Sequence, residues 1–375
     1  MKNNILKLPM LAAVALVIIC TSYAEISKAA PFSDSVRFNR NKIYSLALDG
    51  EIRKALTFLM VSDSTSIPEK EWEFKTRFES RFLYLEDKSG YSDEHRSPID
   101  SLLKIYSDYW RQAFLFPEYN NDSLLMNKLA AFLGGNFGVK NSEIRDDDNL
   151  NIYLKKYVNS KGLQTTGFGR TGKYLDLLVW RSMYDTLYKF NLFSDTINVK
   201  VVFMDGFVTL GWEEYATFGT YYPGGWADSS ALYCVKQAYD LSSENFLVSY
   251  LAHEGRHYSD YGYFPKLSGA DLEYRAKLTE LSLAETSLFK LLKFFIENAN
   301  FESDNSHSVA NYCVVRDLSR AIFSNDFEND IEKWKGIDTR RINEVSYAIL
   351  SKNTEELRKL GINAQDYIKN KRSNG

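Results

Sequence analysis

Residues 253–257 have the sequence His-Glu-Gly-Arg-His, whose residue types and spacing suit metal-dependent hydrolysis. Residues four apart lie on the same face of an α-helix, so His253 and His257 can direct their imidazoles at one ion. Imidazole is a common zinc ligand, and zinc lowers the pKa of a coordinated water to about 7. Glu254 lies beside both histidines and can take a proton from that water and pass it to a leaving group. The pattern predicts a zinc-dependent hydrolase with Glu254 as general base.

The sequence before the motif predicts the helix that must carry it. Ser242 and Ser243 are good N-cap residues, and Glu244 places an acid in the first turn. Apolar residues then follow at helical intervals and can bury one face, namely Leu247, Tyr250, Leu251 and Tyr258. The alternative is a surface helix whose two histidines are only solvated.

A catalytic zinc ion needs a third protein ligand, and a second predicted helix follows closely. Ser268 and Gly269 form a turn, after which residues 270–281 are rich in Leu, Ala, Glu and Lys. Glu273 and Glu280 are seven residues apart, so both lie on the same helical face and either can reach the metal. We expect Glu273 to be the ligand, with Glu280 as the alternative.

These two elements resemble the gluzincin group of zinc metallopeptidases, in which His-Glu-x-x-His is followed on the next helix by Glu-x-x-Ala. Residues 273–276, Glu-Tyr-Arg-Ala, match the second element, and the resemblance covers residues 200–290. It implies one Zn²⁺ bound by His253, His257 and Glu273, with Glu254 as general base. It also implies a peptide or protein substrate and a zincin-like core.

A hydrolase of this kind needs a donor for the oxyanion that forms on the attacked carbonyl. By the same resemblance, which places a histidine on a later segment, His307 is the first candidate. The sequence also allows a polar surface loop at residues 303–308. Four tyrosines are chemically able to serve instead: Tyr221, Tyr222, Tyr258 and Tyr261. Asp260 is expected either to orient a ligand histidine or to lie exposed at the helix end.

Two short strands are predicted before the metal-binding helix. Residues 196–204 are β-branched and aromatic, and residues 231–235 form a second such run. Between them, residues 219–227 contain Gly, Pro and aromatic residues typical of a loop. We expect residues 220–235 either to be the sheet edge that pairs with a substrate backbone or to be an ordinary hairpin that packs Tyr and Trp into the core.

Residues 167–174 approach the spacing of a phosphate-binding loop but end in Tyr174, where that loop has Ser or Thr. The preceding residues 161–166 are too polar for a buried strand. Nucleotide binding is therefore not expected. We expect a flexible surface loop with Arg170 and Lys173 solvated.

The first 24 residues have the features of a secretory signal peptide. A basic start contains Lys2 and Lys7, and the apolar run at residues 10–19 is too short to span a membrane. Small residues allow cleavage before Glu25. We therefore expect an exported protein, periplasmic or secreted, with no stable membrane insertion after cleavage; an uncleaved anchor is the alternative.

Charge and cysteine content narrow the possible partners. The leader carries two lysines and no acid, so its removal changes the net charge from −3 to −5. Such a chain has no basic field for nucleic acid. Cys234 and Cys313 remain, either paired in an oxidising compartment or as two buried thiols. The oligomeric state is left open.

The expected fold class is α+β, predominantly helical, with a zincin-like core and a small sheet beside the metal-binding helix. The predicted divisions are a signal peptide at 1–24, a helical N-terminal lobe at 25–149, a zincin-like metallopeptidase core at 150–300, and a C-terminal helical region at 301–375. Helices in the lobe are expected at residues 42–48, 51–61, 70–85 and 99–116. The competing functions are a zinc amidase acting on a non-protein substrate, a catalytically idle peptide-binding protein with a helical-repeat-like lobe, and a zinc-free structural protein.

Overall fold

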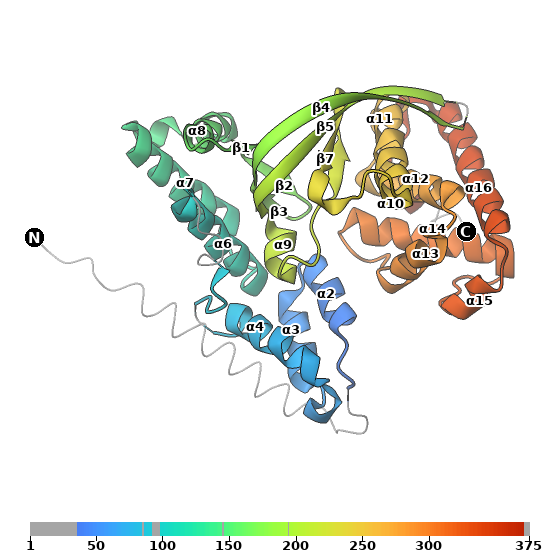
Figure 1. The fold of residues 1–375 in the computed structure, drawn as a ribbon, viewed down its shortest axis with the longest axis horizontal. Helices are drawn as coiled ribbons and strands as arrows, with labels where there is room; N and C mark the ends of the chain where they lie inside the picture. Colours follow the sequence, from blue (N-terminus) through green and yellow to red (C-terminus); the bar gives the residue numbers. More distant parts are fainter. Residues whose placement is uncertain (1–35, 85, 92–97, 145, 194, 371–375) are drawn as a thin grey trace, which may run out of the picture. The chain divides into compact units, whose positions relative to one another are not determined.

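The computed structural model of the chain describes residues 36–84, 86–91, 98–144, 146–193 and 195–370. The predicted signal peptide at residues 1–24 lies outside the described residues. The described chain is predominantly helical with one five-stranded sheet, which agrees with the predicted α+β class (Figure 1). None of the described helices combines the length and the apolar character that a membrane-spanning segment requires.

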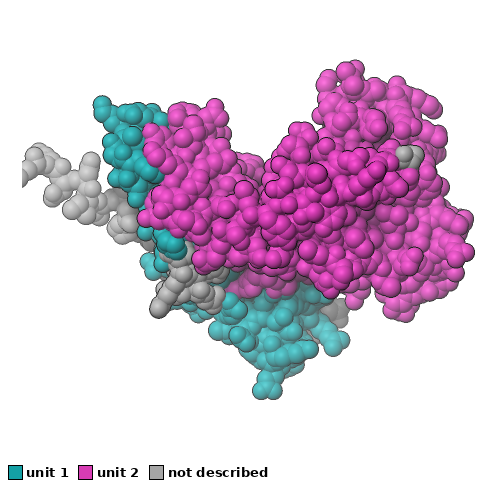
Figure 2. Space-filling view, turned by 45° about the horizontal axis from the view of Figure 1, so that its top comes forward, with its two compact units in different colours: residues 1–145, 215–217 teal, residues 146–214, 218–375 magenta. Residues whose placement is uncertain are grey.

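The chain forms two compact units, which Figure 2 distinguishes by colour. Unit 1 contains residues 1–145 and 215–217, and unit 2 contains residues 146–214 and 218–375. The boundary precedes α8 (Asp147–Ser160), whose N-cap Asp146 accepts a hydrogen bond from the backbone N–H of Asn149. Residues after 301 belong to unit 2.

The four predicted helices of unit 1 are present as α2 (Arg40–Leu48), α3 (Ile52–Val61), α4 (Trp72–Phe82) and α6 (Asp100–Leu115), whereas α7 (Asn121–Phe137) was not predicted. Their core is largely aromatic, because Phe82, Trp110 and Phe114 all pack around the ring of Tyr215. Tyr215 belongs to the short helix α9 (Trp212–Thr217), whose last three residues complete this core.

Unit 2 is built on the five-stranded sheet. Its strands in spatial order are β1 (Gln164–Thr165), β4 (Leu178–Leu192), β5 (Asp195–Leu210), β7 (Ala231–Val235) and β6 (Gly225–Ala227). β5 and β7 are parallel and the other pairs are antiparallel. The two strands predicted at 196–204 and 231–235 are confirmed as β5 and β7. β4, which the sequence analysis did not identify, joins β5 in a long curved ribbon (Figure 1).

Side chains of β5 and β7 alternate between the two faces of this sheet. Val201 and Phe203 point to one face, where they form a cluster with Tyr250 and Leu251 from the segment preceding the metal-binding motif. Met204 points to the other face and packs in a separate cluster. The sheet thereby supports the helix that carries His253 and His257.

The remaining helices of unit 2 pack beside that support. They are α10 (Glu244–Phe246), α11 (His253–Tyr263), α12 (Gly269–Leu283), α13 (Leu288–Glu297), α14 (Ser306–Phe323), α15 (Ile331–Lys335), α16 (Thr339–Leu360) and α17 (Tyr367–Asn370). Leu278, Leu281 and Val314 lie in one buried core shared by α12 and α14, together with Trp334 of α15. α12 is therefore a central helix, and its Glu273 and Glu280 are held by buried neighbours.

Candidate metal centre

The helical segment that carries His253 and His257 begins with a capped turn, which is followed by a π-helical turn. Ser243 accepts a hydrogen bond from the backbone N–H of Phe246, so the predicted N-cap is confirmed. Residues 247–252 then form a π-helical turn, and regular α-helix starts at His253. A π-turn contains more residues than an α-turn. The side chains on its two sides therefore point in different directions around the helix axis from those of a regular α-helix. Leu247, predicted on the buried face, is consequently 49% exposed, whereas Tyr250 is fully buried.

Gly255, inside the motif, allows α11 to lie close to the sheet. A Cβ atom at this position would meet Cζ of Phe190 on β4 at 2.6 Å, which is closer than side chains can approach. Glycine is therefore the residue that fits at residue 255. Nothing in the motif itself indicates what packs against this position.

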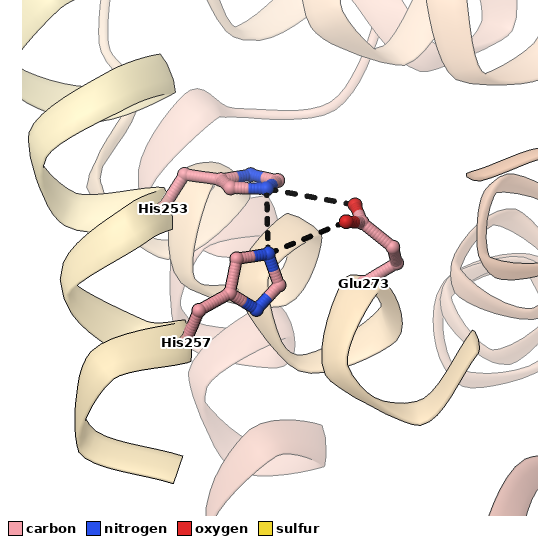
Figure 3. Close-up of side chains that lie close together, drawn as sticks. All are labelled: His253, His257 and Glu273. Atoms are coloured by element: carbon pink, nitrogen blue, oxygen red, sulfur yellow. Dashed lines mark hydrogen bonds and ion pairs between the residues drawn. The ribbon is translucent and has the colours of Figure 1, made fainter. Parts of the chain in front are cut away.

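The three predicted ligands converge on one point (Figure 3). Nε2 of His253 lies 3.1 Å from Nε2 of His257. The Glu273 carboxylate faces both, with Oε2 at 3.5 Å from Nε2 of His253 and Oε1 at 3.3 Å from Nε2 of His257. One candidate ligand atom from each residue lies within 4.8 Å of the others. The arrangement is a compact N, N, O donor set on two adjacent helices.

Glu280, the alternative third ligand, contacts the other side of the same histidine. Its Oε1 lies 2.7 Å from Nδ1 of His253, and both side chains are buried. This contact leaves Nε2 of His253 to face His257 and Glu273. Burial alone would lower the pKa of His253, but the charges of Glu280 and Glu273 outweigh it and raise the pKa to about 10. Glu280 is placed to orient His253, while Glu273 faces both ligand nitrogens.

Glu254 lies within the site but does not join the donor set. Its side chain is buried, and burial raises its pKa despite the nearby histidines. Oε2 of Glu254 has no hydrogen-bond partner among the described residues, and neither does Nδ1 of His257. Buried polar atoms are normally satisfied, so such atoms indicate where water or a ligand binds. Both unpartnered atoms belong to the His-Glu-Gly-Arg-His segment.

His307 is also brought to the site. It lies in the first turn of α14, and its Nδ1 is 2.9 Å from Oε2 of Glu273. Its side chain is nonetheless 61% exposed, so it faces both the cluster and the solvent. Burial alone would raise the pKa of Glu273, but His307 and His253 hold it well below its usual value. The ammonium of Lys277 also lies near Glu273, with Nζ 3.8 Å from the same oxygen.

The pKa values of two further residues are affected by charges of residues in the site. Burial raises the pKa of Tyr261, and the charges of Glu254 and Glu273 raise it further. Burial raises the pKa of Glu213, in the first turn of α9, to about 7 against the opposing effect of His307. Tyr261 was among the predicted oxyanion donors. Glu213 was not identified, because an acid in the first turn of a helix is common and carries no functional signal.

A buried ion pair joins the two ligand-bearing helices. Arg275 on α12 donates from Nε to Oδ2 of Asp260 at 2.6 Å and from Nη2 to Oδ1 at 2.9 Å. Its Nη1 also donates to Asn353 on α16. Both expectations for Asp260 are therefore wrong: it is fully buried rather than exposed, and its carboxylate is engaged by Arg275 rather than by a ligand histidine. The pair fixes α11 against α12 near the donor set.

The glycine-rich segment and the cysteines have ordinary structural roles. Residues 169–176 form the hairpin β2 (Gly169–Thr171) and β3 (Tyr174–Asp176), where a flexible loop was expected. Lys173 pairs with Asp304 at 3.5 Å rather than being only solvated. Cys234 and Cys313 are both buried free thiols, which settles the alternatives left open by the sequence.

The predicted substrate edge, residues 220–235, contains β6 and β7. Among the described strands, β6 is the last in the sheet on this side. Trp226 of β6 stacks on Tyr233 of β7 with ring centroids 5.2 Å apart. The segment is therefore a packed hairpin that also ends the sheet, and its pairing with a substrate stays a prediction. α11 packs against β6, so this edge lies near the metal-binding helix.

Comparison with known proteins returned no relative: no protein-family model, no curated protein and no solved structure matches the chain. The functional argument therefore depends on the geometry of the site.

Proposed function

We propose that this protein is an exported zinc-dependent hydrolase of the peptidase class, with a zincin-like core. The observation that carries the proposal is the convergence of His253, His257 and Glu273 beside the buried carboxylate of Glu254. Export rests on the features of residues 1–24 alone. The resemblance to gluzincins supports the proposal through the same four residues.

The donor set suits zinc. Two imidazole nitrogens and one carboxylate oxygen, with further space for water, form a known catalytic zinc site. The contact of His253 with Glu280 matches the carboxylate–histidine pairs that orient zinc ligands. A bound zinc ion would supply Lewis-acid activation of water and of a substrate carbonyl.

The protein side chains would supply the proton transfers and the positioning. Glu254 accepts a proton from the attacking water through its unpaired oxygen and returns it to the leaving amine. His307, half in solvent and beside Glu273, is placed to donate to the oxyanion when substrate enters. β6, at the end of the sheet near α11, offers main-chain groups to an extended peptide.

Metal analysis of the purified protein tests the zinc part of this proposal. We expect about one zinc per chain, and loss of that zinc in His253→Ala and in Glu273→Ala. Glu297→Ala, which changes an exposed helical carboxylate on α13, is the matched control and should keep its zinc. A parent protein that remains free of zinc after reconstitution would contradict the proposal.

Turnover of a peptide library tests the catalytic part. Glu254→Gln should retain zinc and lose cleavage, because Glu254 is a base and not a ligand. Cleavage of acylated amines but of no peptide would favour the amidase alternative. A Glu254→Gln variant as active as the parent would show that Glu254 is not the base.

A further inference from the structure

Most of strand β4 has one unpaired edge. β5 pairs with β4 along its whole length, from Leu178 to Leu192. On the other side β1 pairs only with Val179 and Trp180, next to the register shift in the ribbon. No other described strand pairs with residues 181–192 on that side. In Figure 1 the long ribbon of β4 and β5 arches over α11 toward α16.

Large apolar side chains are exposed along this edge strand. Leu187 is 82% exposed, Met183 53% and Tyr184 45%. Exposed edge strands template the addition of another strand, and natural proteins usually shorten, charge or cover them. Here the unpaired stretch is long, and its most exposed apolar residue lies at its centre. The strand is therefore suited to pair with another chain.

The sequence of β4 is complementary to itself in an antiparallel register centred on Leu187. A two-fold axis perpendicular to the sheet at Leu187 keeps each side chain on its own face. On the outer face it places Leu187 opposite Leu187 and Asp185 opposite Lys189, and the symmetry makes this ion pair twice. On the inner face it pairs Tyr184 with Phe190. Cross-strand pairs of opposite charge and of aromatic rings stabilise sheets.

Neighbouring registers lose this complementarity. Moving the axis by one residue places Asp185 opposite Leu187 or Asn191, so both ion pairs disappear. Moving it by two residues places Asp185 opposite itself or Lys189 opposite itself, and like charges directly opposite each other are destabilising. Among these five registers, only the one with its axis at Leu187 places Asp185 and Lys189 opposite each other.

We propose that two copies of this protein associate by antiparallel pairing of β4, with the two-fold axis at Leu187. The two sheets then continue through the dimer as one ten-stranded sheet, and the exposed apolar residues of the edge are covered. This surface is independent of the metal centre, so the proposal stands whether or not the protein binds zinc.

Charge reversal tests the register. Sedimentation equilibrium of the purified protein over micromolar to submillimolar concentrations should show a dimer. In Asp185→Lys, two lysines face each other at both ion-pair positions, and we expect the dissociation constant to rise at least about tenfold. Lys189→Asp should have the same effect, and the double variant should return to within about threefold of the parent. A monomeric parent, or a double variant as weak as the single ones, would overturn the proposal.

A cysteine crosslink tests the axis directly. Residues directly opposite in an antiparallel pair have Cα atoms about 4.5–5.5 Å apart, within the range that a disulfide spans. Leu187→Cys should therefore form a disulfide-linked dimer under mild oxidation. Ile152→Cys on α8 is the matched control, since Ile152 is 59% exposed and lies outside the sheet. Equal crosslinking of the two variants, or none at residue 187, would exclude this axis.

Discussion

Glu280 and Glu273 contact opposite sides of His253, and replacing each should affect zinc binding differently. The hydrogen bond between Glu280 and Nδ1 of His253 is 2.7 Å long and buried. A charged hydrogen bond of this kind contributes about 1.5–3 kcal/mol. Since about 1.4 kcal/mol is tenfold in affinity, Glu280→Ala should weaken zinc binding about 10- to 100-fold. Glu280→Gln keeps a hydrogen-bond acceptor and should lose less zinc affinity than Glu280→Ala.

Competition against a chromophoric zinc chelator at neutral pH measures these affinities. Glu273→Ala, which removes a ligand, should lose stoichiometric zinc, while Glu280→Ala should retain it when zinc is in excess. Glu297→Ala serves again as the control. The reasoning is refuted if Glu280→Ala binds zinc as tightly as the parent, or if Glu280→Ala loses zinc while Glu273→Ala keeps it.

Three further outcomes are expected. Arg275→Met leaves the buried carboxylate of Asp260 with only the longer contact from Arg256, 3.8 Å away, and should lower the free energy of unfolding by about 3–5 kcal/mol in urea titration; a loss below about 1 kcal/mol would show that the pair is not structural. Partial burial would raise the pKa of Glu244, but hydrogen bonds from Ser287 and Thr286 lower it to about 2. Because the folded pKa lies below the ordinary value of 4.5, this stabilisation is present above pH 4.5 and is lost as pH falls toward 2. Glu244→Gln should therefore be destabilised by about 1–3 kcal/mol at neutral pH, and urea titrations should show the deficit shrinking in acid; a deficit that does not depend on pH would contradict this. In peptide cleavage, His307→Ala should lower kcat about 10²- to 10³-fold with little change in KM, and an unchanged kcat would remove His307 from the mechanism.

The ligand-bearing helices were predictable because their signals are local. Ser243 was expected as an N-cap, and Ser268 was expected in the turn before the second helix; each accepts a hydrogen bond from a backbone N–H of the following first turn. The four-residue spacing of His253 and His257 sets their shared face without reference to the rest of the fold. Sequence reasoning was sufficient wherever one helical turn determined the geometry.

The choice between Glu273 and Glu280 was beyond the sequence for a physical reason. Seven residues return a helix to the same face, so periodicity cannot separate the two. They differ by about 10 Å along the axis of α12, and the position of α11 against that axis decides which one meets Nε2 of His253. That position depends on tertiary contacts such as the Asp260–Arg275 pair.

Strand β4 was not predicted because the apolar residues in its middle neither alternate with polar ones nor form a continuous run, the two patterns that indicate a strand. Residues 181–187 are exposed on both faces, so no alternation of apolar and polar residues appears there. The strand is specified by its long pairing with β5, a non-local interaction. The role of Gly255 was hidden for the same reason, since it depends on Phe190 from that strand.

The π-helical turn at residues 247–252 separates two functions of one continuous helical segment. Tyr250 and Leu251 within the turn pack against the sheet, whereas the side chains of His253 and His257 after it face α12. Removing one residue from the turn would restore regular α-helix and rotate everything on one side of it by about 100° relative to the other. No single substitution produces such a rotation. The geometry of the His253, His257 and Glu273 cluster therefore depends on the length of this segment as well as on its composition.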